Sequence, residues 1–286
     1  MSPILVFDPA AFSTAFGHSA MLVSHTLGNE PLLELDAIAE LAEELPHTSE
    51  FFEHHLGNVP ALVPGGSESA PRLSASPPEL VRSIDSNGCR MALRHIESVP
   101  RYRALMDRIL DDVTPLIPRR DGRLRKRESF LFLNATSSRV PVHADPEHNF
   151  LLQIRGTKTF RVGTFHDRSR LVPELERQYR GGPSYLTVMP DVLTDFALEP
   201  GTAVYVPPEA AHTVDNGPEV SISLSVTFRT RVTERGVATH RLNSRLRRLG
   251  LTPRPPGESV LIDTTKAFVM HQGQRSATAV RRLKRR

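Results

Sequence analysis

Two potential metal ligands stand two residues apart near the middle of the chain. His143 and Asp145 lie in or beside a predicted strand, because residues 140–144 are apolar and partly β-branched. Side chains at positions i and i+2 of a strand point to the same face, so both can reach one metal ion. A chain with 12 His and 32 acidic residues holds about one such pair by chance, so the pair needs a third ligand to carry weight.

A second segment supplies another histidine. Pro200 and Gly201 predict a turn, residues 204–206 a strand, and Pro207 its end, which places His212 at the start of the following loop. Cys89 is the only cysteine, so neither an intrachain disulfide nor a cysteine-cluster metal site is expected. Histidines and carboxylates are therefore the metal ligands that this chain can offer.

The second segment resembles the second motif of the cupin superfamily. Gly201, Pro207, His212 and Asn216 match that motif in type and spacing, and Glu209 stands where glycine is usual.

The preceding stretch departs from the first cupin motif, because Asp145 replaces its second His, Asn149 its Glu ligand and Ser137 its leading glycine. A site of three His and one Glu is therefore not expected. His143, Asp145 and His212 instead form a two-His, one-carboxylate triad, which is typical of non-haem Fe(II) oxygenases.

The triad ligands on the first segment begin a run of spaced residues: His143, Asp145, Asn149, Phe150, Gln153, Ile154, Arg155, Gly156 and Lys158. With this run, the region around the triad is similar to JmjC-type 2-oxoglutarate oxygenases, nearest the asparaginyl-hydroxylase-like group. The resemblance covers residues 129–230 well, the preceding part loosely and the tail hardly at all. It implies a double-stranded β-helix core, Fe(II), 2-oxoglutarate as cosubstrate, O₂, and hydroxylation of an unactivated C–H bond, with a peptide or protein side chain as the suggested substrate.

The resemblance also implies how the cosubstrate is held. Lys158 supplies a cation for the distal carboxylate of 2-oxoglutarate; the alternative is an exposed lysine in a turn. Asn149 and Thr227 match family positions near the 1-carboxylate end, although Thr227 stands where the closest relatives have Asn. Val140 replaces a hydroxyl that family members often carry, so other donors must complete this pocket.

Other histidines and motifs carry less chemistry. The odd spacing of His148 from the ligands points it away from them, which predicts a surface histidine, and His54 and His55 fall in a segment expected to be helical. Phosphate-binding glycine loops, nucleophile elbows and dinucleotide fingerprints are absent from the sequence. The long interval 161–199 predicts a lid or substrate-binding insert beside the barrel mouth.

The elements that must position the triad divide the chain into three parts. Residues 1–128 are expected to be a mostly helical region that packs on the core, with amphipathic helices near 32–45 and 102–117 and a loop from Pro64 to Pro78. Residues 129–230 contain short β-rich runs typical of an antiparallel barrel. In residues 221–228 hydroxyl and apolar side chains alternate, so the hydroxyl row either lines a ligand cavity or faces water.

Residues 231–286 form a basic tail with 14 Lys or Arg and three acidic residues, a net charge of +11 against −7 for the rest of the chain. This charge allows a nucleic-acid footprint, but Phe268 is the one aromatic residue available for base stacking. Leu242, Leu246 and Leu249 form an apolar stripe on a predicted helix that ends at Gly250. We therefore expect the tail helices to pack on the barrel and to contribute to a homodimer.

Composition limits the class of protein. No apolar run reaches the 18 or so residues of a membrane span, and the N-terminus lacks the pattern of a signal peptide, so the sequence favours a cytoplasmic protein without a membrane partner. Three functions remain open: a hydroxylase acting on a peptide, protein or small molecule; an N-methyl demethylase with the same iron chemistry; and a non-catalytic cupin-like metal sensor or scaffold whose tail binds nucleic acid.

Overall fold

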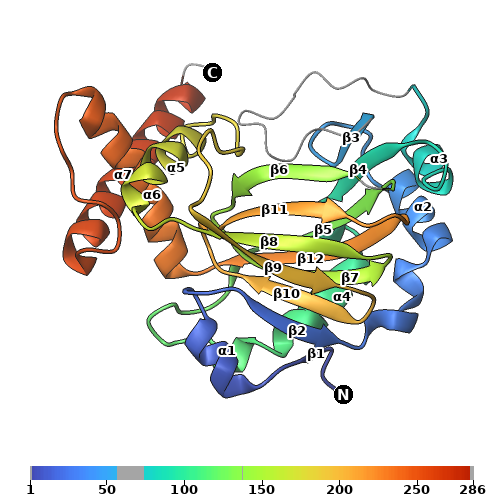
Figure 1. Ribbon diagram of the computed structural model, residues 1–286. Helices are drawn as coiled ribbons and strands as arrows, with labels where there is room; N and C mark the ends of the chain where they lie inside the picture. Colours follow the sequence, from blue (N-terminus) through green and yellow to red (C-terminus); the bar gives the residue numbers. More distant parts are fainter. Residues whose placement is uncertain (1, 57–73, 137, 284–286) are drawn as a thin grey trace.

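Two antiparallel β-sheets face each other at the centre of the molecule (Figure 1). The computed structural model describes residues 2–56, 74–136 and 138–283. The larger sheet has eight strands in the order β1-β2-β10-β7-β12-β5-β4-β3, and the smaller has four in the order β6-β11-β8-β9. The strands are β1 (Leu5–Val6), β2 (Met21–His25), β3 (Phe52–Leu56), β4 (Cys89–Arg94), β5 (Arg125–Asn134), β6 (Arg139–Ala144), β7 (His148–Arg155), β8 (Lys158–Thr164), β9 (Val192–Leu198), β10 (Thr202–Val206), β11 (Ala211–Asn216) and β12 (Ser221–Arg229).

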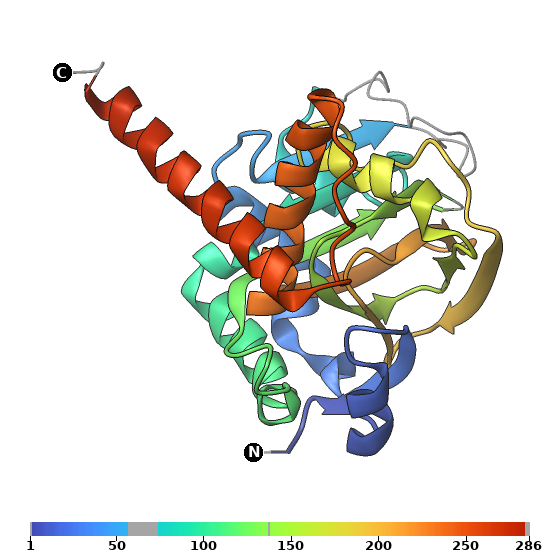
Figure 2. The ribbon, with the colours of Figure 1, turned by 90° about the vertical axis from the view of Figure 1, so that its left-hand side faces the viewer.

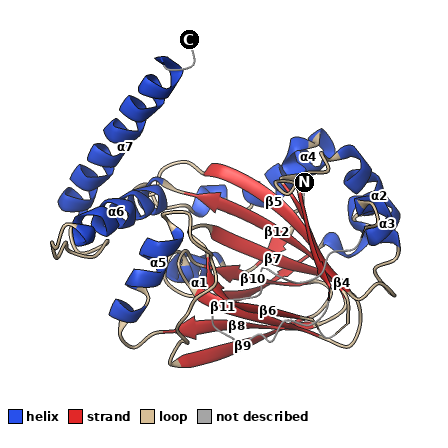
Figure 3. Cartoon of the chain, turned by 90° about the horizontal axis from the view of Figure 1, so that it is seen from above, coloured by secondary structure: helices blue, strands red, loops and turns tan. Residues whose placement is uncertain are grey.

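Helices cover the outer face of the larger sheet and one end of the barrel (Figures 1 and 3). The four N-terminal helices share one large apolar core with the larger sheet. The three later helices gather at the covered end of the barrel. This β core with helical cover is the double-stranded β-helix expected from the sequence. The helices are α1 (Pro9–Ala15), α2 (Leu35–Glu44), α3 (Pro77–Arg82), α4 (Pro100–Asp111), α5 (Val172–Gln178), α6 (Arg231–Arg248) and α7 (Val260–Leu283).

The alternation along β12 separates the core from the barrel interior. Leu224, Val226 and Phe228 lie in the core beneath the helices. Ser225 and Thr227, of opposite parity, line the cavity between the sheets. The hydroxyl row is therefore buried, and the interpretation that it faces water is wrong.

The region before residue 129 is less helical than expected, because β1 to β4 make half of the larger sheet. The segment with His54 and His55 is strand β3, which pairs with β4 in the register Phe52↔Leu93 to Leu56↔Cys89. Long-range strand pairing decides the structure here, since β3 has no apolar alternation of its own. Of the loop expected from Pro64 to Pro78, residues 64–73 lie outside the described residues, and Ser76 caps α3 through Glu79.

Of the two C-terminal helices, α6 packs on the barrel and α7 packs on α6. Val237 of α6 joins an apolar cluster with Val142 and Leu175, and Arg247 Nε lies 3.2 Å from Glu176 Oε1 of α5. The predicted leucine stripe is buried only in part, because Leu242 packs against the α6–α7 contact whereas Leu249 lies just past the last turn of α6 and is 77% exposed. Small and polar side chains make up most of the fully buried face of α6: Ala238, Thr239, His240, Asn243 and Ser244.

Helix α7 is longer than the short final element expected around residues 267–270, and it extends beyond the rest of the molecule (Figure 2). Ala267 and Met270 pack against Ala238 of α6. In the described part of the chain, no helix combines the length and hydropathy needed to cross a membrane.

Candidate metal centre

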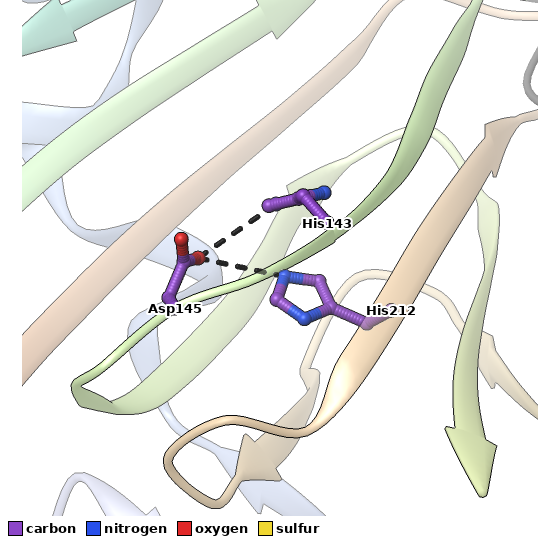
Figure 4. Close-up of side chains that lie close together, drawn as sticks. All are labelled: His143, Asp145 and His212. Carbon is purple, nitrogen blue, oxygen red and sulfur yellow. Dashed lines mark ion pairs between the residues drawn. The ribbon is translucent and has the colours of Figure 1, made fainter. Parts of the chain in front are cut away.

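The structure brings His143, Asp145 and His212 together at one end of the barrel (Figure 4). His143 on β6 and His212 on β11 are register partners of neighbouring strands. Their Nε2 atoms lie 3.7 and 3.6 Å from Asp145 Oδ2, and one ligand atom from each residue falls within 4.8 Å of the others. His212 lies in strand β11, so its expected place in a loop is wrong.

Backbone carbonyls orient both imidazole rings. His143 Nδ1 lies 2.9 Å from the carbonyl oxygen of Pro141, and His212 Nδ1 lies 2.9 Å from that of Ala210. A carbonyl oxygen only accepts hydrogen bonds, so each Nδ1 carries the proton and each Nε2 presents its lone pair toward Asp145. Burial and the neighbouring His143 also lower the pKa of His212, which favours the neutral ring. Two neutral imidazoles and one carboxylate fit a divalent transition metal.

The triad opens into a cavity of about 310 Å³ between the sheets. All six residues proposed from the sequence line this cavity: His143, Asp145, His212, Asn149, Lys158 and Thr227. The cavity is large enough for a small organic cosubstrate beside a metal ion.

Lys158 lies at the start of β8 with 5% of its surface exposed, so the alternative of an exposed turn lysine is wrong. Its Nζ donates to Ser223 Oγ at 2.6 Å, and Ser223 Oγ donates to Gln153 Oε1 at 2.7 Å. Burial lowers the pKa of Lys158 to about 7. Among the described residues no carboxylate pairs with this amine, which leaves it suited to an anionic ligand.

Asn149 and Thr227 are register partners on β7 and β12, on the cavity wall. Asn149 Oδ1 accepts a hydrogen bond from Ser225 Oγ at 2.8 Å, so the orientation of its amide is fixed by the neighbouring strand. Thr227 Oγ1 makes a long contact of 3.4 Å with the carbonyl oxygen of Glu128. Both side chains are placed to meet a ligand in the cavity, and their cosubstrate roles stay predictions.

The sequence did not single out Tyr185. The insert between β8 and β9 carries it to the cavity, where it forms an isolated β-bridge with His143, and the two ring centroids are 6.1 Å apart. Arg177 Nη2 donates to the Tyr185 carbonyl oxygen at 2.6 Å and anchors this contact. The insert was expected to approach the barrel mouth, but nothing in its local pattern marks the tyrosine that does so.

His148 is buried, with 1% exposed, so the expectation of a surface histidine is wrong. Its ring stacks against Phe16 and Phe228, and its Nδ1 is hydrogen-bonded to the Tyr205 hydroxyl at 2.8 Å. Parity correctly turns it away from the triad, but that side of β7 faces the helix-covered core. Burial lowers the pKa of His148 to about 3, which keeps it neutral.

Comparison with known proteins gives one family match and several structural matches. Residues 122–235 match the family model of the JmjC domain. Similar solved structures include the X-ray structure of Escherichia coli ycfD (19% identity, TM-score 0.52, 96% of this chain and 69% of that chain covered) and the crystal structure of E. coli ribosomal oxygenase YcfD (17%, 0.54, 96% and 68%). A third is YcfD in complex with cobalt and 2-oxoglutarate (17%, 0.53, 96% and 68%).

At these identities the structural likeness shows the fold. No curated protein sequence matches the chain. The matched range includes the triad and the run from His143 to Lys158 on which the resemblance was based. Over residues 122–235 the chain is therefore similar to JmjC domain proteins, as its sequence indicated.

Proposed function

We propose that this protein is an Fe(II)- and 2-oxoglutarate-dependent oxygenase that hydroxylates an unactivated C–H bond of a protein side chain. The observation that carries the proposal is the convergence of His143, Asp145 and His212 on one point of a cavity that also contains a buried lysine. The family match and the neighbours solved as a ribosomal oxygenase, one of them with cobalt and 2-oxoglutarate, support it.

The residues of this chain divide the work as follows. His143, Asp145 and His212 would hold the metal, with Pro141 and Ala210 carbonyls fixing the histidine tautomers. The Lys158 ammonium would pair with the distal carboxylate of the cosubstrate. When bound, Fe(II) with 2-oxoglutarate and O₂ supplies the oxidising chemistry, which releases succinate and CO₂ and adds one oxygen atom to the substrate.

The barrel interior favours this enzyme over a non-catalytic metal sensor. A buried lysine without a carboxylate partner among the described residues is costly to desolvate, and a structural metal site has no use for it. Lys158 lines the same cavity as the triad, which is where a cosubstrate bound to the metal would extend. N-methyl demethylation uses the same metal chemistry, so the product decides between these two reactions.

Product identification tests the proposal. The protein is incubated with a cell lysate, Fe(II) and 2-oxoglutarate, and the lysate proteins are analysed by mass spectrometry. We expect one polypeptide to gain a single oxygen atom with the wild type and not with His212→Ala. Loss of a methyl group would indicate demethylation, and no change in any polypeptide would contradict a protein substrate.

We further propose that the protein is a homodimer that acts in the cytoplasm, with α7 in the dimer interface. Leu261, Phe268 and Val269 on α7 are 77%, 61% and 50% exposed, an apolar surface that a second copy would cover. Phe268→Glu should lower the mass measured by light scattering, whereas Leu22→Glu, on β2 and also half exposed, should not. Cell fractionation tests the location.

A further inference from the structure

The turn between β10 and β11 touches the backbone of one proposed metal ligand and the ring of another. The Glu209 N–H donates to the Asp145 carbonyl oxygen at 2.7 Å. The next residue, Ala210, accepts from His212 Nδ1 at 2.9 Å. The conformation of two consecutive residues therefore sets the position of Asp145 and the ring orientation of His212.

Glu209 holds this turn in a conformation that disfavours glutamate. Its φ is +62°, in the left-handed region where a side chain is strained and glycine is not. Glycine is also the usual residue at this position of the cupin motif. A glutamate here needs contacts of its own that offset the strain.

The Glu209 carboxylate has such contacts, from three different segments. Oε1 accepts from the Tyr179 hydroxyl at 3.2 Å and lies 3.3 Å from His240 Nε2, and Oε2 accepts from Arg168 Nη2 at 3.1 Å. Tyr179 follows α5, and His240 lies on α6 with its side chain 2% exposed. Burial alone would raise the pKa of Glu209, but its partners, His240 foremost, bring it below the usual value, so the group stays a carboxylate.

We infer that Glu209 is a positioning residue through which α5 and the C-terminal helix α6 hold the metal-binding turn in place. The inference rests on the proposed function and gives the tail a role within it. Helix α6 packs beside α5 at the triad end of the barrel (Figure 1). His240 contacts the Glu209 carboxylate, and the Glu209 backbone N–H donates to Asp145. These two contacts join the tail to the metal centre.

Binding of Co(II) alone, followed by its visible absorption spectrum, tests the inference. Glu209→Gly removes the carboxylate and relieves the backbone strain, so a purely structural role predicts an undiminished Co(II) affinity. We expect instead an affinity about tenfold weaker and an altered spectrum, since changes just outside the ligands commonly cost 10- to 100-fold. Glu209→Gln, which still accepts hydrogen bonds from Tyr179 and His240, should restore part of the affinity.

Glu176→Gln is the matched control, because Glu176 is another buried glutamate that joins α5 to α6 but does not touch the turn. It should bind Co(II) like the wild type. His240→Ala removes the contact that α6 makes with the Glu209 carboxylate. It should lower the Co(II) affinity, and it tests the inference even if Glu209→Gly does not fold. The inference is overturned if Glu209→Gly and His240→Ala both keep the wild-type Co(II) affinity. It is also overturned if Glu176→Gln loses as much Co(II) affinity as those two variants do. A wild-type protein that binds no Co(II) would overturn the proposed function itself, and the inference with it.

Discussion

Replacing Lys158 by methionine removes the proposed cosubstrate anchor while keeping the length of the side chain. Lys158 is 5% exposed and its amine donates a hydrogen bond to a neutral hydroxyl, Ser223 Oγ. A carboxylate bound there would form a buried ion pair, and losing one partner of such a pair costs about 3 to 5 kcal/mol. That corresponds to a rise in the 2-oxoglutarate KM of roughly a hundredfold to a few thousandfold.

The assay measures succinate release against 2-oxoglutarate concentration for the wild type and Lys158→Met, with Co(II) binding as the control for the metal site. Metal binding should be unchanged in the variant. An unaltered 2-oxoglutarate titration would refute the assignment and place the anchor elsewhere in the cavity.

The pH dependence gives a second check on the same residue. With a pKa of about 7, Lys158 in the free protein is largely protonated below that pH and loses its charge above it. Binding an anion requires the charged form, so proton uptake must accompany binding at higher pH. The wild-type KM should therefore rise above about pH 7, by up to roughly tenfold per pH unit. Lys158→Met should lack this rise.

Three further predictions concern other parts of the site and fold. His143→Ala, Asp145→Ala and His212→Ala should each abolish turnover with little change in melting temperature, and full activity in any of them would exclude that residue as a ligand. Tyr185→Ala should raise the KM for the protein substrate about tenfold and leave the turnover of 2-oxoglutarate in the absence of that substrate unchanged. If turnover falls equally with and without the protein substrate, Tyr185 supports the metal site instead. His148→Ala should cost about 3 kcal/mol or more in urea unfolding. Burial lowers the pKa of His148 to about 3 in the folded protein, so on acidification this histidine is protonated in the unfolded chain first. The free energy of unfolding of the wild type should therefore fall as the pH drops below about 6.5, and His148→Phe should reduce that fall.

The candidate site was largely predictable because its signals are local. His143 and Asp145 share a strand face by parity, and the spacing to Lys158 and His212 matched known motifs, so the six proposed residues line one cavity. The hydroxyl row of β12 was equally visible in the alternation of residues 221–228.

What the sequence missed depends on contacts between distant segments. Strand β3 has no alternation and is specified by its pairing with β4, and Tyr185 reaches the cavity through the path of an irregular insert. Parity placed His148 on the right side of β7, but only the packing of Phe16 shows that this side is covered. The role of Glu209 was similarly hidden, since its partners come from α5 and α6.

The most direct test of the central claim is the release of CO₂ from 2-oxoglutarate labelled in its 1-carboxylate, measured with purified protein and Fe(II). The account predicts release by the wild type that a protein substrate stimulates, and none by His212→Ala, whose metal ligand is removed. A wild-type protein that binds the metal but releases no labelled CO₂ under any condition that keeps it folded would contradict the account and favour a non-catalytic metal-binding protein.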